Sequence, residues 1–258
     1  MPGKEILYQV EGHVARITLN APGKRNALNY TMVDALIAAL EAAEDNIDLR
    51  VVLLTAAGDN FSAGGDLKEF RSEIDDTALS HWHSGASWEK LFELIPRMTK
   101  PVVAAVQGSA LAGGCGLVAL SDIAIAAENA QFGMTEIKVG LFPLLVLPAI
   151  RRAVGHKASI DLALTGRIIN ANEALRLGLV SRVVSLAEFD ESVSKLVSEL
   201  ASYSSNAMSL GKRLFRDTAD MTYAQAISYA RSMRVAYMLS DDLREGINAF
   251  LGKRKPEW

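Results

Sequence analysis

The sequence is poor in several features, and each scarcity excludes a class of protein. Its 258 residues include one cysteine, Cys115, so no disulfide can form within the chain, which is typical of a reducing compartment. No run of about eighteen apolar residues occurs, which argues against a membrane-spanning helix. Met1–Val10 contains no apolar stretch of signal-peptide length. We therefore expect a soluble cytoplasmic protein with no membrane partner.

Neither sign of charge dominates, and metal-ligand patterns are weak. There are 27 Lys and Arg residues against 30 Asp and Glu, a net charge of −3, so nucleic acid is not the expected partner. His81 and His83 lie in the polar stretch Ser72–Ser87, which predicts a long surface loop. With no cysteine or carboxylate pair nearby, they do not predict a metal site, although they could line the mouth of a substrate site.

Half of the residues are apolar, enough for a large core. Three short apolar runs predict strands buried on both faces, which requires helices to alternate with strands: Val51–Thr55, Pro101–Val106 and Asp122–Ala126. Val14–Leu19 alternates like a half-buried strand, with Ala15, Ile17 and Leu19 on one face. Thr31–Ala43 has helical spacing, and Thr31 with Asp34 predicts a cap at its start.

The last part of the chain has only helical patterns. Apolar residues recur at helical spacing from Val193 to Leu200, at Leu210 and Leu214, and again from Ala224 to Ala230. No strand pattern follows Val184. We therefore predict an α/β body over residues 1–195, followed by an all-helical region over residues 196–258.

Two glycine-rich turns follow predicted strands. They are Phe61–Leu67 (FSAGGDL) and Gly108–Gly116 (GSALAGGCG), and the second continues into an apolar stretch that could be helical. Glycines there let backbone N–H groups approach a ligand, and two such donors can form an oxyanion hole. The alternative for either turn alone is tight packing. Neither matches a dinucleotide or phosphate-loop motif, and Ser62 and Ser109 are predicted to be turn residues rather than nucleophiles.

Glu136 is the main candidate for acid–base chemistry. It lies in Gln131–Pro143 (QFGMTEIKVGLFP), among mainly apolar neighbours and shortly after a predicted strand. A carboxylate in such surroundings has a raised pKa and can carry a proton. The alternative is a surface glutamate in a turn.

These segments together resemble the enoyl-CoA hydratase/isomerase (crotonase) family over nearly the whole chain. The matching segments, all in the right order, are Arg25–Asn29, Phe61–Phe70, Lys100–Leu117, Ala130–Pro143, Leu164–Leu179 and Ser240–Pro256. The resemblance implies an α/β fold, a crotonase-like spiral of repeated ββα units with a C-terminal helical trimerisation region. It also implies a homotrimer or a hexamer built as a dimer of trimers.

The resemblance further implies an acyl-CoA thioester as substrate, with coenzyme A as part of that substrate and no permanently bound cofactor. The oxyanion donors would be the N–H groups of Gly65 and Gly113, and Glu136 the catalytic carboxylate. The residues implied to hold the adenine, pantetheine and phosphates are Ala27, Ala63, Asp66 and Leu67, with Lys24, Arg25, Lys68 and Lys253 as basic candidates.

Two departures from the family pattern bear on the reaction. Hydratases of this family place two glutamates around the added water; Glu136 matches the second, but the first falls on Gly116. The usual glycine-rich stretch is Leu144–Pro148 (LLVLP), which predicts a drier pocket. Both favour a Δ3,Δ2-enoyl-CoA isomerase. Hydration with one glutamate, other reactions on the same scaffold and a non-catalytic acyl-CoA-binding subunit remain open.

Overall fold

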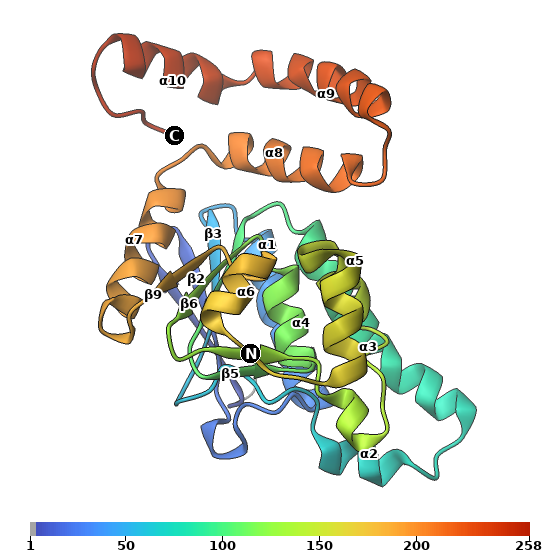
Figure 1. Ribbon diagram of the computed structural model, residues 1–258. Coiled ribbons are helices and arrows are strands. Elements are labelled where there is room, and N and C mark those ends of the chain that lie inside the picture. The colour runs from blue at the N-terminus through green and yellow to red at the C-terminus, as the bar shows by residue number, and fades with distance from the viewer. Residues whose placement is uncertain (1–3) are drawn as a thin grey trace.

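Strands and helices alternate along most of the chain, and only helices follow (Figure 1). The computed structural model describes residues 4–258; residues 1–3, the start of Met1–Val10, lie outside the described residues. The strands are β1 Ile6–Glu11, β2 Val14–Leu19, β3 Val51–Ala56, β4 Val102–Val106, β5 Ser109–Leu111, β6 Ile123–Ala127, β7 Gln131–Gly133, β8 Ile169–Asn170 and β9 Arg182–Val184.

Helices connect these strands and then form the C-terminal region. The α-helices are α1 Tyr30–Asp45, α2 Leu67–Glu73, α3 Ala78–Arg97, α4 Gly113–Leu120, α5 Leu147–Thr165, α6 Ala171–Leu177, α7 Phe189–Ala201, α8 Ser205–Thr218, α9 Tyr223–Met238 and α10 Asp241–Leu251. Three short 3₁₀ helices are η1 Pro22–Lys24, η2 Glu136–Val139 and η3 Leu186–Glu188. The α/β fold with a C-terminal helical region is therefore confirmed.

The strands form two sheets that the chain visits in turn. The large sheet has the order β1-β2-β3-β4-β6-β9 and is parallel except between β1 and β2. The small sheet has the order β5-β7-β8. Because β4 is followed by β5 and β6 by β7, successive turns of the chain add one strand to each sheet. This is the expected spiral of repeated ββα units.

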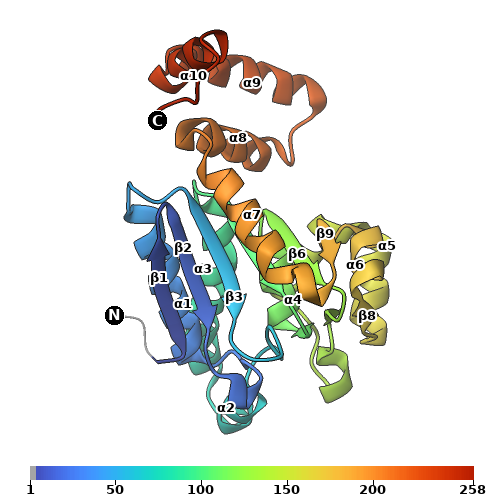
Figure 2. The same ribbon diagram turned by 90° about the vertical axis from the view of Figure 1, so that its left-hand side faces the viewer.

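The large sheet is covered on both faces, as its apolar strands require. Ala15, Ile17 and Leu19 of β2 are fully buried and belong to the main core together with α1 and part of α3. On the opposite face α7 packs across β2, β3 and β6 (Figure 2). The division expected between residues 195 and 196 therefore falls within a helix that belongs to the core of the body.

The cap predicted for α1 was wrong. The helix begins at Tyr30, and the side-chain oxygen of Asn29 accepts a hydrogen bond of 2.7 Å from the backbone N–H of Met32. Thr31 is therefore inside the first turn. The physical reason is that Asn29, which has an extended backbone, can turn its side chain toward the free N–H groups of the first turn.

The loop predicted over Ser72–Ser87 was also wrong. α2 ends at Glu73, and α3 begins at Ala78, with the Thr77 hydroxyl accepting from the backbone N–H of Ser80. The first buried residue of α3 is Trp88. The large apolar side chains of its first half, Leu79 and Trp82, are exposed, so this half lacks the buried face typical of a helix in a core. His81 and His83 also lie exposed, on a helix rather than on a loop.

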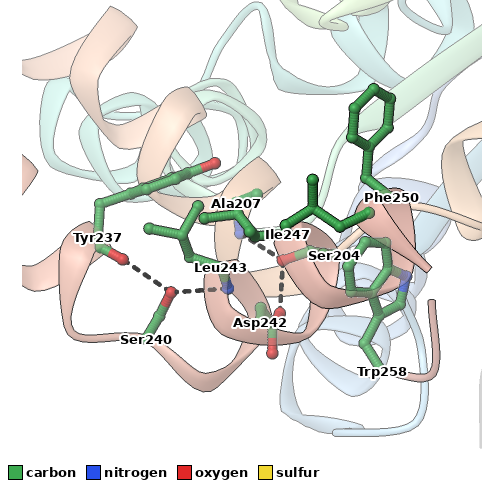
Figure 3. A pocket seen from close by; sticks show the side chains of 11 residues that line it. Ser204, Ala207, Tyr237, Ser240, Asp242, Leu243, Ile247, Phe250 and Trp258 are labelled. Atoms are coloured by element: carbon green, nitrogen blue, oxygen red, sulfur yellow. Dashed lines mark hydrogen bonds between the residues drawn. The ribbon is translucent and has the colours of Figure 1, made fainter.

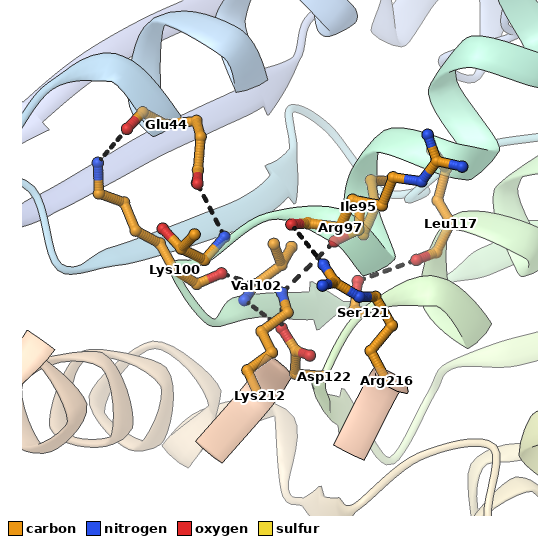
Figure 4. Close-up of polar contacts among 11 residues, drawn as sticks. Glu44, Ile95, Arg97, Lys100, Val102, Leu117, Ser121, Asp122, Lys212 and Arg216 are labelled. Atoms are coloured by element: carbon orange, nitrogen blue, oxygen red, sulfur yellow. Dashed lines mark hydrogen bonds and ion pairs between the residues drawn. The ribbon is translucent and has the colours of Figure 1, made fainter. Parts of the chain in front are cut away.

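α8, α9 and α10 form a separate layer at one end of the body (Figures 1 and 2). The half-buried Lys212 of α8 connects this layer to the body (Figure 4). Its ammonium lies 2.6 Å from a carboxylate oxygen of Asp122 and donates to the carbonyl of Lys100 at 3.0 Å. The same Asp122 oxygen accepts from the N–H of Val102, at the start of β4. Burial lowers the pKa of Lys212, and the nearby Asp122 opposes that shift.

The layer also has an internal polar contact. The hydroxyl of Ser204 caps α8 and donates to the carboxylate of Asp242 in α10, beside the ring of Trp258 (Figure 3). This contact orders the ends of α8 and α10 relative to each other. Within residues 4–258 the structure contains no helix long and apolar enough to cross a membrane.

Lys212→Met should reduce the free energy of unfolding by about 1–3 kcal/mol, because it leaves the carboxylate of Asp122 without its cation. The side-chain length is preserved, so packing changes little. Urea unfolding measures the loss, and Lys195→Met, at an exposed lysine of α7, is the control. Equal stability of the two variants would contradict a role for Lys212 in joining α8 to the body.

Candidate active site

Two buried polar side chains shape the first glycine-rich turn. Asn26, at a positive φ of 51°, donates from its amide to the carbonyls of Ala57 and Asn60. The hydroxyl of Ser62 donates to the carbonyl of Asn26 at 2.8 Å and accepts from the N–H of Gly64 at 3.1 Å. Ser62 is fully buried and engaged on both sides, as expected of a turn residue. These bonds hold the turn that ends at Gly65.

The second turn leads directly into α4. Ala112, the residue before this helix, has φ 49° and ψ −122°, a strained conformation for a residue with a side chain. Its N–H donates to the carbonyl of Gly133 at 2.8 Å, which ties the turn to β7. The strained residue is thereby held, and Gly113 becomes the first residue of the helix.

The two turns touch through their backbones. A Cβ added to Gly64 would lie 2.5 Å from the Cβ of Ala112 and 3.3 Å from the amide nitrogen of Gly113. Within residues 4–258, neither the N–H of Gly65 nor that of Gly113 donates a hydrogen bond to the protein. The N–H of Gly113 also lies at the positive end of α4. Two unused donors on adjoining turns are the elements of an oxyanion hole.

Glu136 begins η2, three residues after the end of β7. Pairing of β7 with β5 brings this segment beside the start of α4. One carboxylate oxygen of Glu136 is buried and has no hydrogen-bond partner among residues 4–258. Burial raises the pKa of Glu136, and a hydrogen bond from its own backbone only partly opposes the shift. The carboxylate is therefore suited to accept a proton.

A pocket of about 460 Å³ brings these groups together. Gly65, Gly113 and Glu136 all line it. One wall is residues 141–146, which are all apolar and include Leu144–Val146 from the predicted dry stretch Leu144–Pro148. Cys115, buried beside the pocket, has its pKa raised to about 12, mainly by burial, so its thiol stays protonated. The site thus offers two N–H donors and a carboxylate in largely apolar surroundings.

Polar side chains also line the pocket. They include Tyr30, Glu73, His81 and Ser84. The hydroxyl of Tyr30 donates to the carboxylate of Glu73 at 2.9 Å. Burial raises the pKa of Tyr30, so this hydroxyl stays protonated as a donor. Glu73 is therefore a second carboxylate of the pocket, but it already accepts a hydrogen bond. His81 lies at the mouth, as the sequence allowed.

With one exception, the remaining predicted residues lie on two adjoining loops, which we call the rim, and none of them lines the pocket of Glu136. Ala63 donates its N–H to the carbonyl of Arg25, and Leu28 pairs with Gly65, so the two loops lie side by side. This pairing groups the following predicted residues: Lys24, Arg25, Ala27, Ala63, Asp66, Leu67 and Lys68. Lys253 follows α10, at the end of the molecule opposite α2 (Figures 1 and 2).

Comparison with known proteins identifies the family. The family model described as enoyl-CoA hydratase/isomerase matches residues 9–258. A relative from Danio rerio, named enoyl-CoA hydratase domain-containing protein 3, mitochondrial, is 37% identical over 253 residues, covering 98% of this chain and 86% of the relative. This chain belongs to the enoyl-CoA hydratase/isomerase family. The resemblance drawn from six sequence segments is thus confirmed.

Solved structures of this enoyl-CoA hydratase/isomerase family share the whole fold. An enoyl-CoA hydratase of Mycobacterium smegmatis superposes with a TM-score of 0.93 and 35% identity, covering 98% of each chain. Human enoyl-CoA hydratase domain-containing protein 3 gives a TM-score of 0.93 at 34% identity, covering 98% of this chain and 100% of that chain. Since some relatives are named as mitochondrial, the expected cytoplasmic location stays a prediction.

Sequence reasoning missed several residues that shape this family site. Asn26 positions the first turn, Ala112 the second, and Trp88 of α3 closes the pocket over Gly113. Trp88, Leu91 and Ile95 are spaced three and four apart and are the buried residues of α3, a helical signal in its second half. The strained backbone of Ala112 leaves no signal in the sequence.

Glu136→Gln should stabilise the protein above neutral pH and have little effect near pH 4. The folded-state pKa of Glu136 is raised, so its contribution to stability is lost as pH rises through that pKa. Gln removes the unpaired charge. We expect a gain of about 1 kcal/mol at pH 8, or about 2–4 °C in Tm. Differential scanning calorimetry measures the change in Tm, and Glu89→Gln, at an exposed glutamate, is the control. An equal gain at pH 4 and pH 8 would show that the charge of Glu136 is not the cause.

Proposed function

We propose that this family member is a Δ3,Δ2-enoyl-CoA isomerase. The observation that carries the proposal is Glu136, which lines one pocket with Gly65 and Gly113. Among residues 4–258, one carboxylate oxygen of Glu136 has no hydrogen-bond partner, and the N–H groups of the two glycines donate to none of these residues. The position expected for the first glutamate of a hydratase is Gly116, which has no side chain. One base and an oxyanion hole suffice to move a double bond.

The proposed reaction is a proton transfer along the acyl chain. The thioester oxygen accepts hydrogen bonds from the N–H groups of Gly65 and Gly113, which stabilise negative charge on that oxygen. Glu136 removes a proton from C2, the enolate forms, and Glu136 returns the proton at C4. The double bond thereby moves from C3–C4 to C2–C3, into conjugation with the carbonyl. The apolar wall of residues 141–146 favours this reaction because water is not required.

Hydration of a 2-enoyl-CoA is the second candidate. Two observations favour it: Glu73 adds a second carboxylate to the pocket, and similar proteins are named enoyl-CoA hydratases. Against it, Glu73 comes from α2 and is engaged by the Tyr30 hydroxyl. A non-catalytic acyl-CoA-binding subunit is disfavoured, because such a role gives no reason to keep Glu136 ionisable in apolar surroundings.

For coenzyme A we propose the rim formed by the loops around Arg25 and Asp66. Lys24, Arg25 and Lys68 supply positive charge there, and Ala63 and Leu67 supply apolar surface. Lys253 follows α10, at the end of the molecule away from this rim. It could therefore contact a coenzyme A phosphate only in a neighbouring subunit.

We also propose a homotrimer or a dimer of trimers. The helical layer exposes large apolar side chains, including Phe215 at 84% and Phe250 at 82%. Such surfaces on monomers are uncommon and mark interfaces. Assembly would bury them and would supply Lys253 to a neighbouring site.

The reaction is tested with 3-enoyl-CoA in ¹⁸O-labelled water. The proposal predicts unlabelled 2-enoyl-CoA and slow or no hydration of added 2-enoyl-CoA. Glu136→Gln should lower kcat by about 10² or more, while substrate still binds, because the amide cannot carry the proton. Mass spectrometry follows the label. Rapid formation of labelled 3-hydroxyacyl-CoA by the unmodified protein would instead establish hydration.

The assembly is tested by light scattering at micromolar concentration. We expect three or six times the 27.8 kDa of one chain. Phe250→Asp should shift the protein toward smaller species, because a charge in the buried interface has no partner. Glu89→Lys, a charge change at an exposed residue of α3 and outside the layer of α8, α9 and α10, is the control. A stable monomer of the unmodified protein would contradict the proposal.

A further inference from the structure

α3 places two aromatic side chains on the glycine-bearing face of α4. Trp88 and Phe92 are four residues apart, so they point to the same side of α3. Their ring centroids lie 6.2 Å apart, with the rings inclined at 51°. Gly113 and Gly116 lie three residues apart on α4, facing these rings. The rings therefore rest on backbone, with no side chain of α4 between them.

The space beside Gly116 is filled by this packing. A Cβ added to Gly113 would lie 3.1 Å from the Trp88 ring, which is tight. One added to Gly116 would lie 2.7 Å from Cζ of Phe92 and 3.3 Å from Cγ1 of Val146. Val146 is also part of the wall of the pocket that contains Glu136. A side chain leaving α4 at residue 116 would thus enter the volume that Phe92 and Val146 occupy.

This packing has a chemical consequence. Residue 116 is where the family resemblance places the first glutamate of hydratases. An aromatic ring and an aliphatic side chain offer a water molecule no hydrogen-bond partner, and an ordered water usually needs two to four. Residue 116 therefore lacks a carboxylate, and the space that a carboxylate and its bound water would need is also filled.

We propose that Phe92 is a specificity-determining residue, which fills the volume beside Gly116 and so keeps water from the side of the acyl site that Val146 borders. The inference rests on the proposed function in one respect, namely that Glu136 acts on the acyl chain. Phe92 acts by occupying volume and not by touching reacting atoms. It limits the site to proton transfer.

The test restores both the space and the carboxylate. Gly116→Glu alone should fold poorly, with Tm lowered on the order of 5 °C or more, because the ring blocks the new side chain. Phe92→Ala with Gly116→Glu should recover part of this loss. It should also raise the ratio of hydration to isomerisation by at least about tenfold, measured in ¹⁸O-labelled water with 2-enoyl-CoA and 3-enoyl-CoA as separate substrates.

Two matched controls separate space from chemistry. Phe92→Ala with Gly116→Gln has the same shape but lacks the carboxylate, so it should not gain the tenfold increase. Phe92→Leu keeps an apolar side chain in the volume and should leave the ratio near that of the unmodified protein. If the ratio of hydration to isomerisation rises in both the Glu and the Gln double variants, the carboxylate at residue 116 is not what admits and activates water. That result would overturn the inference.

The packing has a readout independent of activity. Gly116→Ala should lower Tm on the order of 5 °C in the otherwise unmodified protein, but by much less when it is combined with Phe92→Ala in a double-mutant cycle. No coupling would show that the two positions do not compete for one volume, which overturns the inference.

The inference and the proposed function fail in different ways. If the unmodified protein isomerises and the folded double variant, Phe92→Ala with Gly116→Glu, does not hydrate, the role of Phe92 is refuted while the isomerase stands. If the unmodified protein does neither reaction but this double variant hydrates, the isomerase proposal fails and the role of Phe92 is supported.

Discussion

The site depends on the close approach of two backbone turns. Gly64 meets Ala112, and Gly114 meets Ser62, at distances that leave no room for a further Cβ. This contact keeps the N–H groups of Gly65 and Gly113 near each other, and neither donates a hydrogen bond within residues 4–258. Rigid backbone donors need no rearrangement when charge develops on a ligand, which is the basis of oxyanion stabilisation. The buried hydrogen bonds of Asn26 and Ser62 hold the first turn in the position where it meets the second.

The same contact explains the electrostatics of Glu136. β7 pairs with β5, which belongs to the second turn. η2, three residues further along the chain, therefore places the carboxylate of Glu136 beside the start of α4. Burial raises the pKa of Glu136, whereas the positive end of α4 favours negative charge on a bound ligand. Both effects suit the proposed reaction, in which Glu136 would accept a proton and the two N–H groups would stabilise the negative charge on the thioester oxygen.

The sequence predicted β2, β3, β4, β6 and the helical C-terminal region, because these depend on local patterns. Local patterns also indicated the two glycine-rich turns and Glu136, whereas the choice of Gly65 and Gly113 came from the family resemblance and stays a prediction. β3, β4 and β6 are apolar runs, and glycines mark both turns. It did not predict α3 in full, since that helix has buried residues only from Trp88 onward. The cap at Asn29 and the packing of Phe92 on Gly116 depend on how segments meet in space, which spacing along the chain does not encode. The roles of the rim residues still rest on the family resemblance.

The order of strands in the large sheet bears on how the chain folds during synthesis. β1, β2, β3, β4, β6 and β9 lie side by side in the order in which they leave the ribosome. Each new strand finds its neighbour already present, so no strand has to insert between two others. Glu136 and both turns precede α7, which covers the sheet, and the layer that bears Lys253 is made last. The residues that line the pocket can therefore come together on a nascent chain before the layer of α8, α9 and α10 is made.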